Sequence, residues 1–327
     1  MKPSIFAFLA VLAAPAAAFA GEETTSSPTD ATPTKEETQP KKEDVKTAAP
    51  DSKERATDAT PKPLEAAPTL KQRFTADPIG DVGLILGSLG FAVTLDMING
   101  TGEIRPQQIS SSFQTSHLLA IDRTAVHQTP DPNARMFSNL GLFAAVGFAV
   151  VDPFVSGLRE KSVQTALVDA MIYAEAASIT LSVTNLAKMA VRRPRPQAYI
   201  DFEAHKNDPN YSNAETDSSL SFFSGHASMV ASISATATYL AFVRSPNTAR
   251  PWITLVAGTA LTSFVSVERV RGAAHFPTDV IAGGIAGAGI GILVAHLHRT
   301  DELKQRRIWV GAAPEKSGGS LQLSGFF

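Results

Sequence analysis

The chain has 327 residues, which is enough for one large domain or two ordinary ones. Its 29 Lys and Arg and 31 Asp and Glu give a net charge of −2, so no basic excess indicates nucleic acid as a partner. The absence of cysteine excludes a disulfide scaffold, a thiolate nucleophile, an iron–sulfur cluster and cysteine-ligated zinc. Aromatic residues make up only 7%, and this composition suits closely packed helices better than a β-sandwich.

The first 20 residues have the features of a secretory signal. One Lys precedes an apolar stretch, and a small-x-small cleavage site, Ala-Phe-Ala, ends at residue 20. An uncleaved membrane anchor is the alternative, but the apolar run is short for a membrane span. We therefore predict a cleaved signal peptide over 1–20 and a mature protein that is periplasmic or otherwise extracytoplasmic.

A polar stretch follows the signal. Residues 21–70 contain seven Pro, eleven acidic and seven basic residues and no aromatic residue. Such a segment cannot bury enough apolar surface to offset the entropy cost of ordering. We predict a disordered Pro/Thr/charged linker over 21–72, a helical domain over 73–300 and a C-terminal tail over 301–327.

Six apolar segments in the remaining chain are too long for strands and rich in Ala and Leu, which predicts an all-α helical bundle. They lie near residues 82–98, 136–151, 164–190, 227–243, 251–267 and 280–297. Four of them contain uncharged runs of only 14 to 17 residues, whereas a membrane span needs about 20. A soluble bundle is therefore favoured, although a membrane bundle stays open. Gly283, Gly287 and Gly291 form a small-residue face that permits close helix contact in lipid and in water.

A cluster of four cations ends the third apolar segment. Pro194 and Pro196 stop the helix there. Cations at a helix C-terminus complement the helix dipole, but four of them followed by two prolines exceed what capping needs. Arg side chains suit bidentate phosphate contact, and Lys adds a point charge. The cluster consists of Lys188, Arg192, Arg193 and Arg195.

The second candidate motif is Ser-Phe-Phe-Ser-Gly-His over residues 221–226. Ser224 and Gly225 lie where the fourth apolar helix begins, and free backbone N–H groups at such a position bind anions. A simple Ser N-cap is the alternative. His226 adds a titratable group in the first turn. A serine hydrolase is unsupported because the chain lacks a G-x-S-x-G elbow at this motif.

The third candidate motif runs from Glu268 to Asp279. Arg269 ends one apolar helix, His275 precedes the next helix, and Asp279 lies in its first turn. A carboxylate that accepts the second N–H of an imidazole fixes its tautomer and raises the basicity of the other nitrogen. A metal site at His275 and Asp279 lacks an obvious third and fourth ligand.

An antiparallel bundle with short links would bring these three helix ends to one side, which predicts an active site at the converging ends. These ends carry cations, N–H donors, two histidines and one carboxylate. A multiply charged oxyanion, such as a phosphoryl group, is the ligand that such a set would bind.

Together the three motifs resemble the type 2 phosphatidic acid phosphatase superfamily, which is related in fold to vanadium haloperoxidases and bacterial acid phosphatases. That pattern is K-x6-R-P, then P-S-G-H, then S-R-x5-H-x3-D, and all internal spacings fit this sequence. Two positions depart from it. Phe223 replaces the usual Pro, which puts the loop geometry in doubt, and Glu268 replaces the usual Ser. A carboxylate there would repel substrate unless it points away or pairs with Arg269 or Arg271.

The resemblance implies a role for each matching residue. His275 would attack phosphorus and form a phosphohistidine, Asp279 would orient His275, and His226 would act as general acid and then base. The implied phosphate-binding residues are Lys188, Arg195, Ser224, Gly225 and Arg269. The resemblance implies no metal and no other cofactor.

The function implied by this resemblance is a metal-independent phosphatase that hydrolyses phosphomonoesters or pyrophosphates. The sequence does not choose between lipid and soluble substrates, and membrane association stays open. A vanadium-dependent haloperoxidase and a non-catalytic phosphate-binding protein are the alternatives. Residues 197–220 are expected to form a loop, either a lid or a surface insertion. Two apolar-alternating runs in the tail suggest a β-hairpin.

Overall fold

The computed structural model describes residues 73–104, 106–110, 112–205, 207–208, 220–300, 309–315 and 318–324. The predicted signal peptide and the whole of the predicted linker lie outside the described residues. Six long helices dominate the described part, and each contains one of the predicted apolar segments, so the predicted all-α bundle is confirmed. They are α2 (Pro78–Gly100), α4 (Ala134–Glu160), α5 (Val163–Val191), α8 (Gly225–Arg244), α9 (Arg250–Arg271) and α10 (Pro277–Leu297).

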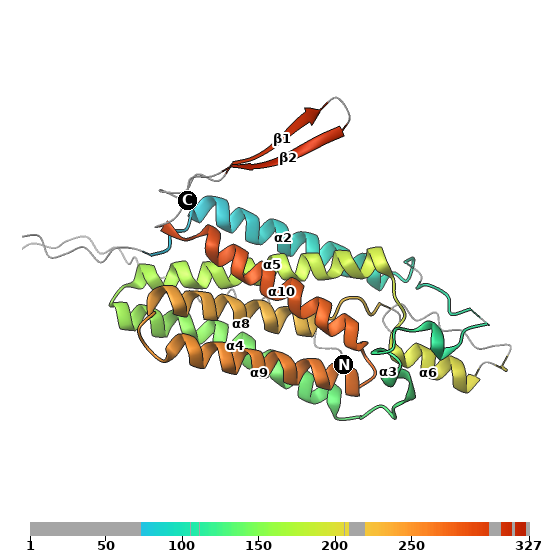
Figure 1. Cartoon of the computed structure of the whole chain (residues 1–327). Coiled ribbons are helices and arrows are strands. Elements are labelled where there is room, and N and C mark those ends of the chain that lie inside the picture. The colour runs from blue at the N-terminus through green and yellow to red at the C-terminus, as the bar shows by residue number, and fades with distance from the viewer. Residues whose placement is uncertain are drawn as a thin grey trace, which may run out of the picture. The chain divides into compact units, whose positions relative to one another are not determined.

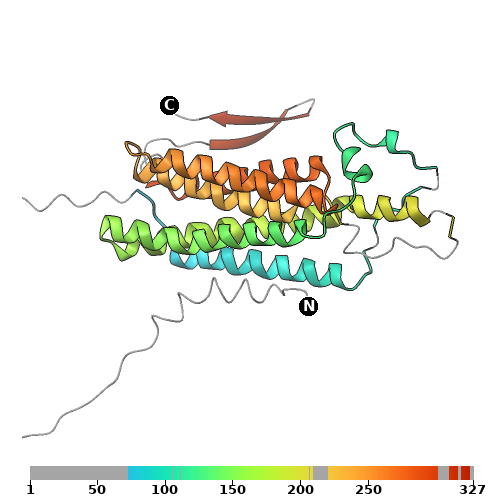
Figure 2. The same cartoon turned by 90° about the horizontal axis from the view of Figure 1, so that it is seen from below.

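The long helices lie side by side along a common direction (Figures 1 and 2). Three short helices lie in the connections, and α3 and α6 are found at one end of the bundle in both views. These short elements are η1 (Thr115–His117), α3 (Thr124–His127) and α6 (Pro196–His205). The predicted loop at 197–220 is therefore wrong over its first nine residues, which α6 contains, and residues 209–219 lie outside the described residues.

The helix ends that matter for the site have clear local causes. Ser162 caps α5, because its Oγ accepts a hydrogen bond of 3.2 Å from the Thr165 N–H. At the other end of α5, Arg192 adopts the left-handed conformation with φ 50°, which ends the helix before Pro194. Pro277 occupies the first turn of α10, where its missing N–H costs nothing.

Glycines bring α8 and α10 into backbone contact. A Cβ at Gly287 would lie 1.9 Å from the Ser228 carbonyl oxygen, and one at Gly291 would lie 2.3 Å from the Ser232 carbonyl oxygen. A Cβ at Gly283 would likewise lie 2.7 Å from the Ser224 carbonyl oxygen. The predicted small-residue face is therefore confirmed as a helix-packing surface.

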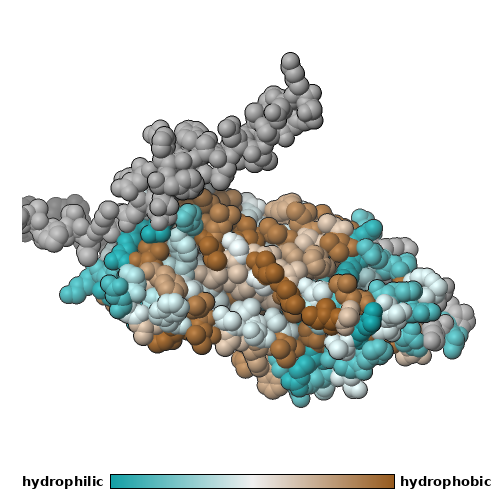
Figure 3. Space-filling model, viewed as in Figure 1, coloured by the Kyte–Doolittle hydropathy of each residue, from teal (hydrophilic) through white to brown (hydrophobic). Residues whose placement is uncertain are grey.

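Large apolar side chains are exposed on five of the six long helices, all but α8, and Figure 3 shows brown patches over the bundle surface. Ile79, Leu158 and Ile285 are 86%, 79% and 71% exposed. A soluble protein rarely exposes this much contiguous apolar surface. All six helices, of 20 to 29 residues, are long and apolar enough to cross a membrane.

The preference for a soluble bundle is therefore corrected, and the structure supports membrane association. Counting only uncharged runs underestimated the helices, because they continue past charged residues. Helix α4, for example, includes Asp152 and continues to Glu160.

In the tail, β1 (Trp309–Glu315) and β2 (Gly318–Ser324) pair antiparallel. Trp309 lies opposite Ser324, and Glu315 lies opposite Gly318. These two strands overlap the two runs for which the sequence suggests a hairpin.

Gly287→Ala should destabilise the protein, because the added methyl group cannot fit against the Ser228 carbonyl without separating α8 from α10. We expect a loss of about 1–3 kcal/mol, measured as a lower midpoint of thermal denaturation in detergent. Gly289→Ala on the same helix is the matched control, since a Cβ there meets nothing within 4 Å. Equal midpoints for the two variants would contradict the packing described above.

Candidate active site

Four helix ends meet at the end of the bundle that also carries α3 and α6 (Figures 1 and 2). They are the C-terminal ends of α5 and α9 and the N-terminal ends of α8 and α10. The three sequence motifs occupy these ends and the turns between them.

His275 lies in the turn between α9 and α10, and its side chain is only 1% exposed. Its Nδ1 lies 2.8 Å from the backbone carbonyl oxygen of Ser221. Because a carbonyl can only accept, Nδ1 carries the proton and Nε2 of the neutral ring has the free lone pair.

Positive charges surround His275. Burial lowers the pKa of His275 well below its ordinary value of 6.5, and the charges of Arg269, Arg195 and Lys188 lower it further. His226 also acts on His275 in the same direction. The structure thus brings together the two histidines and three cations that the motifs predict.

The cations approach from two helices and one turn. Lys188 lies in the last turn of α5, and its Nζ is 3.8 Å from where a Cβ of Gly225 would lie. Arg269 is buried in the last turn of α9, and its Nη1 is 3.4 Å from the Ser138 hydroxyl. The Lys188 ammonium therefore lies next to the first turn of α8.

His226 in the first turn of α8 contacts a residue that the sequence did not indicate. Its Nε2 lies 2.8 Å from Oδ1 of Asn139 on α4, so Nε2–H donates to the amide oxygen. Asn139 thus orients the ring and keeps a proton on Nε2. Both residues are half-buried, whereas His275 is fully buried.

The predicted direct contact between Asp279 and His275 is replaced by an indirect one. The Asp279 carboxylate accepts from the Ser221 hydroxyl and from the Phe276 N–H, and Ser221 in turn accepts from His275 through its carbonyl. Asp279 therefore acts on His275 by fixing the Ser221 loop.

Ser224 also differs from its predicted role. Its hydroxyl caps α8 by accepting from the Ala227 N–H, and its own N–H donates to the Asp279 carbonyl at 3.1 Å. That N–H is occupied within the protein, so it does not serve as a phosphate donor in this structure. The N–H of Gly225 lies one residue further, in the first turn of α8.

Arg193 has a structural role that its place among four cations did not indicate. Nη1 lies 2.6 Å from Asp279 Oδ1, Nη2 lies 2.8 Å from Asp122 Oδ2, and the guanidinium stacks 4.0 Å above the Phe276 ring. Asp122 is fully buried and also accepts from the N–H and hydroxyl of Thr278. Arg193 thereby neutralises two buried carboxylates next to the site.

Glu268, the departure from the family pattern, pairs with Arg271 rather than Arg269. Arg271 Nη1 lies 2.8 Å from Glu268 Oε1, and its Nη2 pairs with Asp131. Pairing with Arg271 is one of the arrangements predicted from the sequence in which the Glu268 carboxylate would not repel substrate. Phe223, the other departure, is buried beside Gly283.

Four residues that form contacts in the site have little or no signal in the sequence pattern. Asn139 and Ser138 lie inside an apolar helix with no motif around them, and Asp122 lies in a connection. Ser221 belongs to the second motif, but it contacts His275 through its backbone carbonyl. The type of a residue does not indicate that its backbone carbonyl will accept a particular hydrogen bond.

Arg193→Gln should destabilise the protein by about 3 kcal/mol, because it leaves the carboxylates of Asp122 and Asp279 buried without their cation. The midpoint of thermal denaturation in detergent measures this. Arg192→Gln is the matched control, since Arg192 is adjacent and exposed. If both variants unfold at the same temperature, Arg193 does not hold the site together.

A comparison with protein-family sequence patterns agrees with the three motifs. Residues 169–302, which contain all three motifs, match the sequence model of the PAP2 superfamily. No curated protein gave a match. Among solved structures, the chain is similar to the first transmembrane PAP2 type phosphatidylglycerolphosphate phosphatase from Bacillus subtilis, with 20% identity and a TM-score of 0.41 over 66% of this chain and 94% of that one. The resemblance inferred from the motifs is thus confirmed: residues 169–302 carry the sequence pattern of the PAP2 superfamily.

Proposed function

We propose that this protein is a membrane-associated phosphatase that works through a phosphohistidine on His275. The PAP2 match supports a phosphatase of this superfamily. The observation that carries the proposal is the convergence of Lys188, Arg195, Arg269 and His226 on His275. This set offers one nucleophile, one acid and three fixed positive charges, which are the groups that phosphoryl transfer requires.

In the first step, the Nε2 lone pair of His275 attacks phosphorus. A P–N bond forms, the bond from phosphorus to the leaving oxygen breaks, and His226, acting as the imidazolium, gives a proton to that oxygen and becomes neutral. The hydrogen bond from Nδ1 to the Ser221 carbonyl keeps Nε2 unprotonated for the attack. Asp279 is a positioning residue in this scheme, because it holds Ser221 and does not reach the imidazole.

In the second step, water attacks the phosphohistidine. His226 now takes a proton from the water, the P–N bond breaks, and inorganic phosphate leaves with His275 restored. The same cations bind the phosphoryl oxygens in both steps, so the charge that develops in each transition state meets groups already in place.

We further propose that the substrate is a phosphate ester or pyrophosphate presented at a membrane surface, on the extracytoplasmic side. The exposed apolar helix faces support a bilayer environment, and the predicted signal supports the side. A headgroup at the bilayer surface would meet a site built from helix ends, where charged groups can remain hydrated.

His275→Ala should lower kcat by about three orders of magnitude or more, because the nucleophile is removed. Lys188→Ala should lower kcat/KM about a hundredfold, because one fixed charge is lost. Detergent-extracted full-length protein is assayed on a lipid phosphate and on a soluble phosphate ester, with His127→Ala, an exposed histidine on α3, as the control. Near-normal turnover by the His275 variant rules out this nucleophile, and wild-type protein inactive on both substrates supports a non-catalytic role.

The pH profile provides a separate test. Because the pKa of His275 is lowered, its ring stays neutral below pH 6.5. After correction for the ionisation of the substrate, the acid limb of the kcat/KM profile should therefore have its midpoint below pH 6.5. Lys188→Gln removes one of the charges that lower this pKa, so the acid limb should shift to higher pH. An acid limb that does not move, or moves to lower pH, contradicts the proposed electrostatics.

A further inference from the structure

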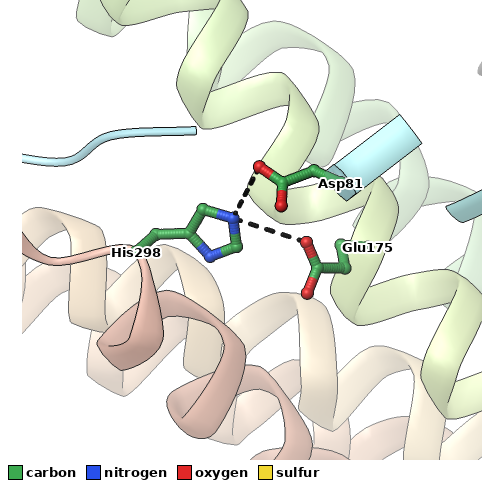
Figure 4. A group of neighbouring side chains, drawn as sticks. All are labelled: Asp81, Glu175 and His298. Carbon is green, nitrogen blue, oxygen red and sulfur yellow. Dashed lines mark hydrogen bonds and ion pairs between the residues drawn. The ribbon is translucent and has the colours of Figure 1, made fainter. Parts of the chain in front are cut away.

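A second group of ionisable side chains lies away from the active site. Asp81 in the first turn of α2, Glu175 in the middle of α5 and His298 just after α10 point toward one another (Figure 4). Glu175 precedes Lys188 by 13 residues on α5, which corresponds to about 20 Å along the helix. The phosphatase scheme uses none of these three residues.

The three side chains present their ligand atoms to a common centre. Nε2 of His298 lies 3.2 Å from Asp81 Oδ2 and 3.4 Å from Glu175 Oε2, and all three atoms lie within 4.8 Å of one another. His298 and Glu175 are buried, and Asp81 is partly exposed. Ionisable groups buried among apolar helices are costly and commonly mark a functional site.

The other nitrogen of His298 fixes its tautomer. Nδ1 lies 2.9 Å from the Val294 carbonyl oxygen, so Nδ1 carries a proton. In a neutral ring, Nε2 then turns a lone pair toward two carboxylates, which is repulsive. A second proton on the ring, a proton on one carboxyl group or a cation between the three groups would remove this repulsion. A histidine that ligates a metal shows this same arrangement, with its other N–H donated to a carbonyl.

Glu175 favours the cation over the proton. Its Oε2 is buried and makes no hydrogen bond, although it lies 3.4 Å from Nε2. If Nε2 carried a proton, its single N–H would point at Asp81 and would leave the Glu175 oxygen without a hydrogen bond. An imidazolium would also leave the cluster with a net charge of −1, whereas a divalent cation with a neutral ring gives zero.

The surrounding backbone holds the three groups in place. The Asp77 N–H donates to Asp81 Oδ2 at 2.8 Å, which orients that carboxylate. The Thr75 N–H donates to the His298 carbonyl at 2.8 Å, and Phe74 pairs with Arg299 as an isolated antiparallel bridge. The cluster is thus fixed by contacts between distant parts of the chain before any ion binds.

We propose that Asp81, Glu175 and His298 bind a divalent transition-metal cation of the Zn²⁺ type. Tetrahedral ligands at the usual distances of about 2.0–2.2 Å lie about 3.3–3.6 Å apart, close to the separations of Nε2 from the two carboxylate oxygens. Water supplies the remaining coordination at the partly exposed Asp81 side. The imidazole favours such a metal over Mg²⁺ or Ca²⁺, which prefer oxygen ligands. The bound cation is structural and ties α2, α5 and α10 together.

The test measures metal binding by untagged full-length protein in detergent, after treatment with a chelator. Zn²⁺ is titrated calorimetrically and counted by elemental analysis after dialysis, and Co²⁺ serves as a spectroscopic probe of the coordination. We expect one Zn²⁺ per chain and a higher midpoint of thermal denaturation when it is bound. Glu175→Gln and His298→Gln should each weaken Zn²⁺ binding at least about a hundredfold and abolish the visible Co²⁺ bands.

His296→Gln is the matched control, because His296 lies two residues away and contacts the Tyr239 hydroxyl instead. It should bind Zn²⁺ as the wild type does. If His298→Gln fails to fold, Glu175→Gln, which keeps the side-chain size, decides the outcome alone. Three results would overturn the site: no saturable Zn²⁺ binding, unchanged binding by Glu175→Gln, or equal affinity for Mg²⁺. None of these measurements uses phosphatase activity, so they stand or fall independently of the proposed function.

Discussion

The backbone contact between α8 and α10 is the constraint on which the candidate active site depends. Helix α8 begins at the second motif and α10 begins just after the third, so the separation of these two helices sets the separation of the motifs. Glycines at 283, 287 and 291 reduce that separation until the Ser224 N–H donates directly to the Asp279 carbonyl. Side chains at these glycines would force the two helix starts apart and separate the imidazoles of His226 and His275.

Arg193 neutralises carboxylates in the protein, and this determines which cations of the motifs are left to bind substrate. It lies between the buried carboxylates of Asp122 and Asp279, which would otherwise oppose a phosphate nearby. Because this arginine is committed to carboxylates, the proposed positive charge for substrate comes from Lys188, Arg195 and Arg269. Charges of the first motif therefore serve two purposes, one structural and one proposed to be catalytic.

Much of the fold followed from the apolar segments, because runs of 15 or more residues rich in Ala and Leu have few alternatives to helix. The glycine spacing also predicted the close helix contact correctly. Residue type alone does not separate Arg193 from Arg195, since both are arginines beside prolines; the spacing of the family pattern selected Arg195, but no local pattern indicated the carboxylate partners of Arg193. Contacts of His275 with a backbone carbonyl, and of His226 with Asn139, depend on three-dimensional neighbours that no local pattern specifies.

Phe223 has a thermodynamic consequence for the loop before α8. A proline at this position restricts the chain in the unfolded as well as the folded state, and its effect is largely entropic. Phe223 instead holds the loop by burying its ring beside Gly283 and edge-to-face with Phe222. Burial of apolar surface carries a heat-capacity change and weakens on cooling. The segment that leads into His226 is consequently held less firmly in the cold than a proline-stiffened loop would be.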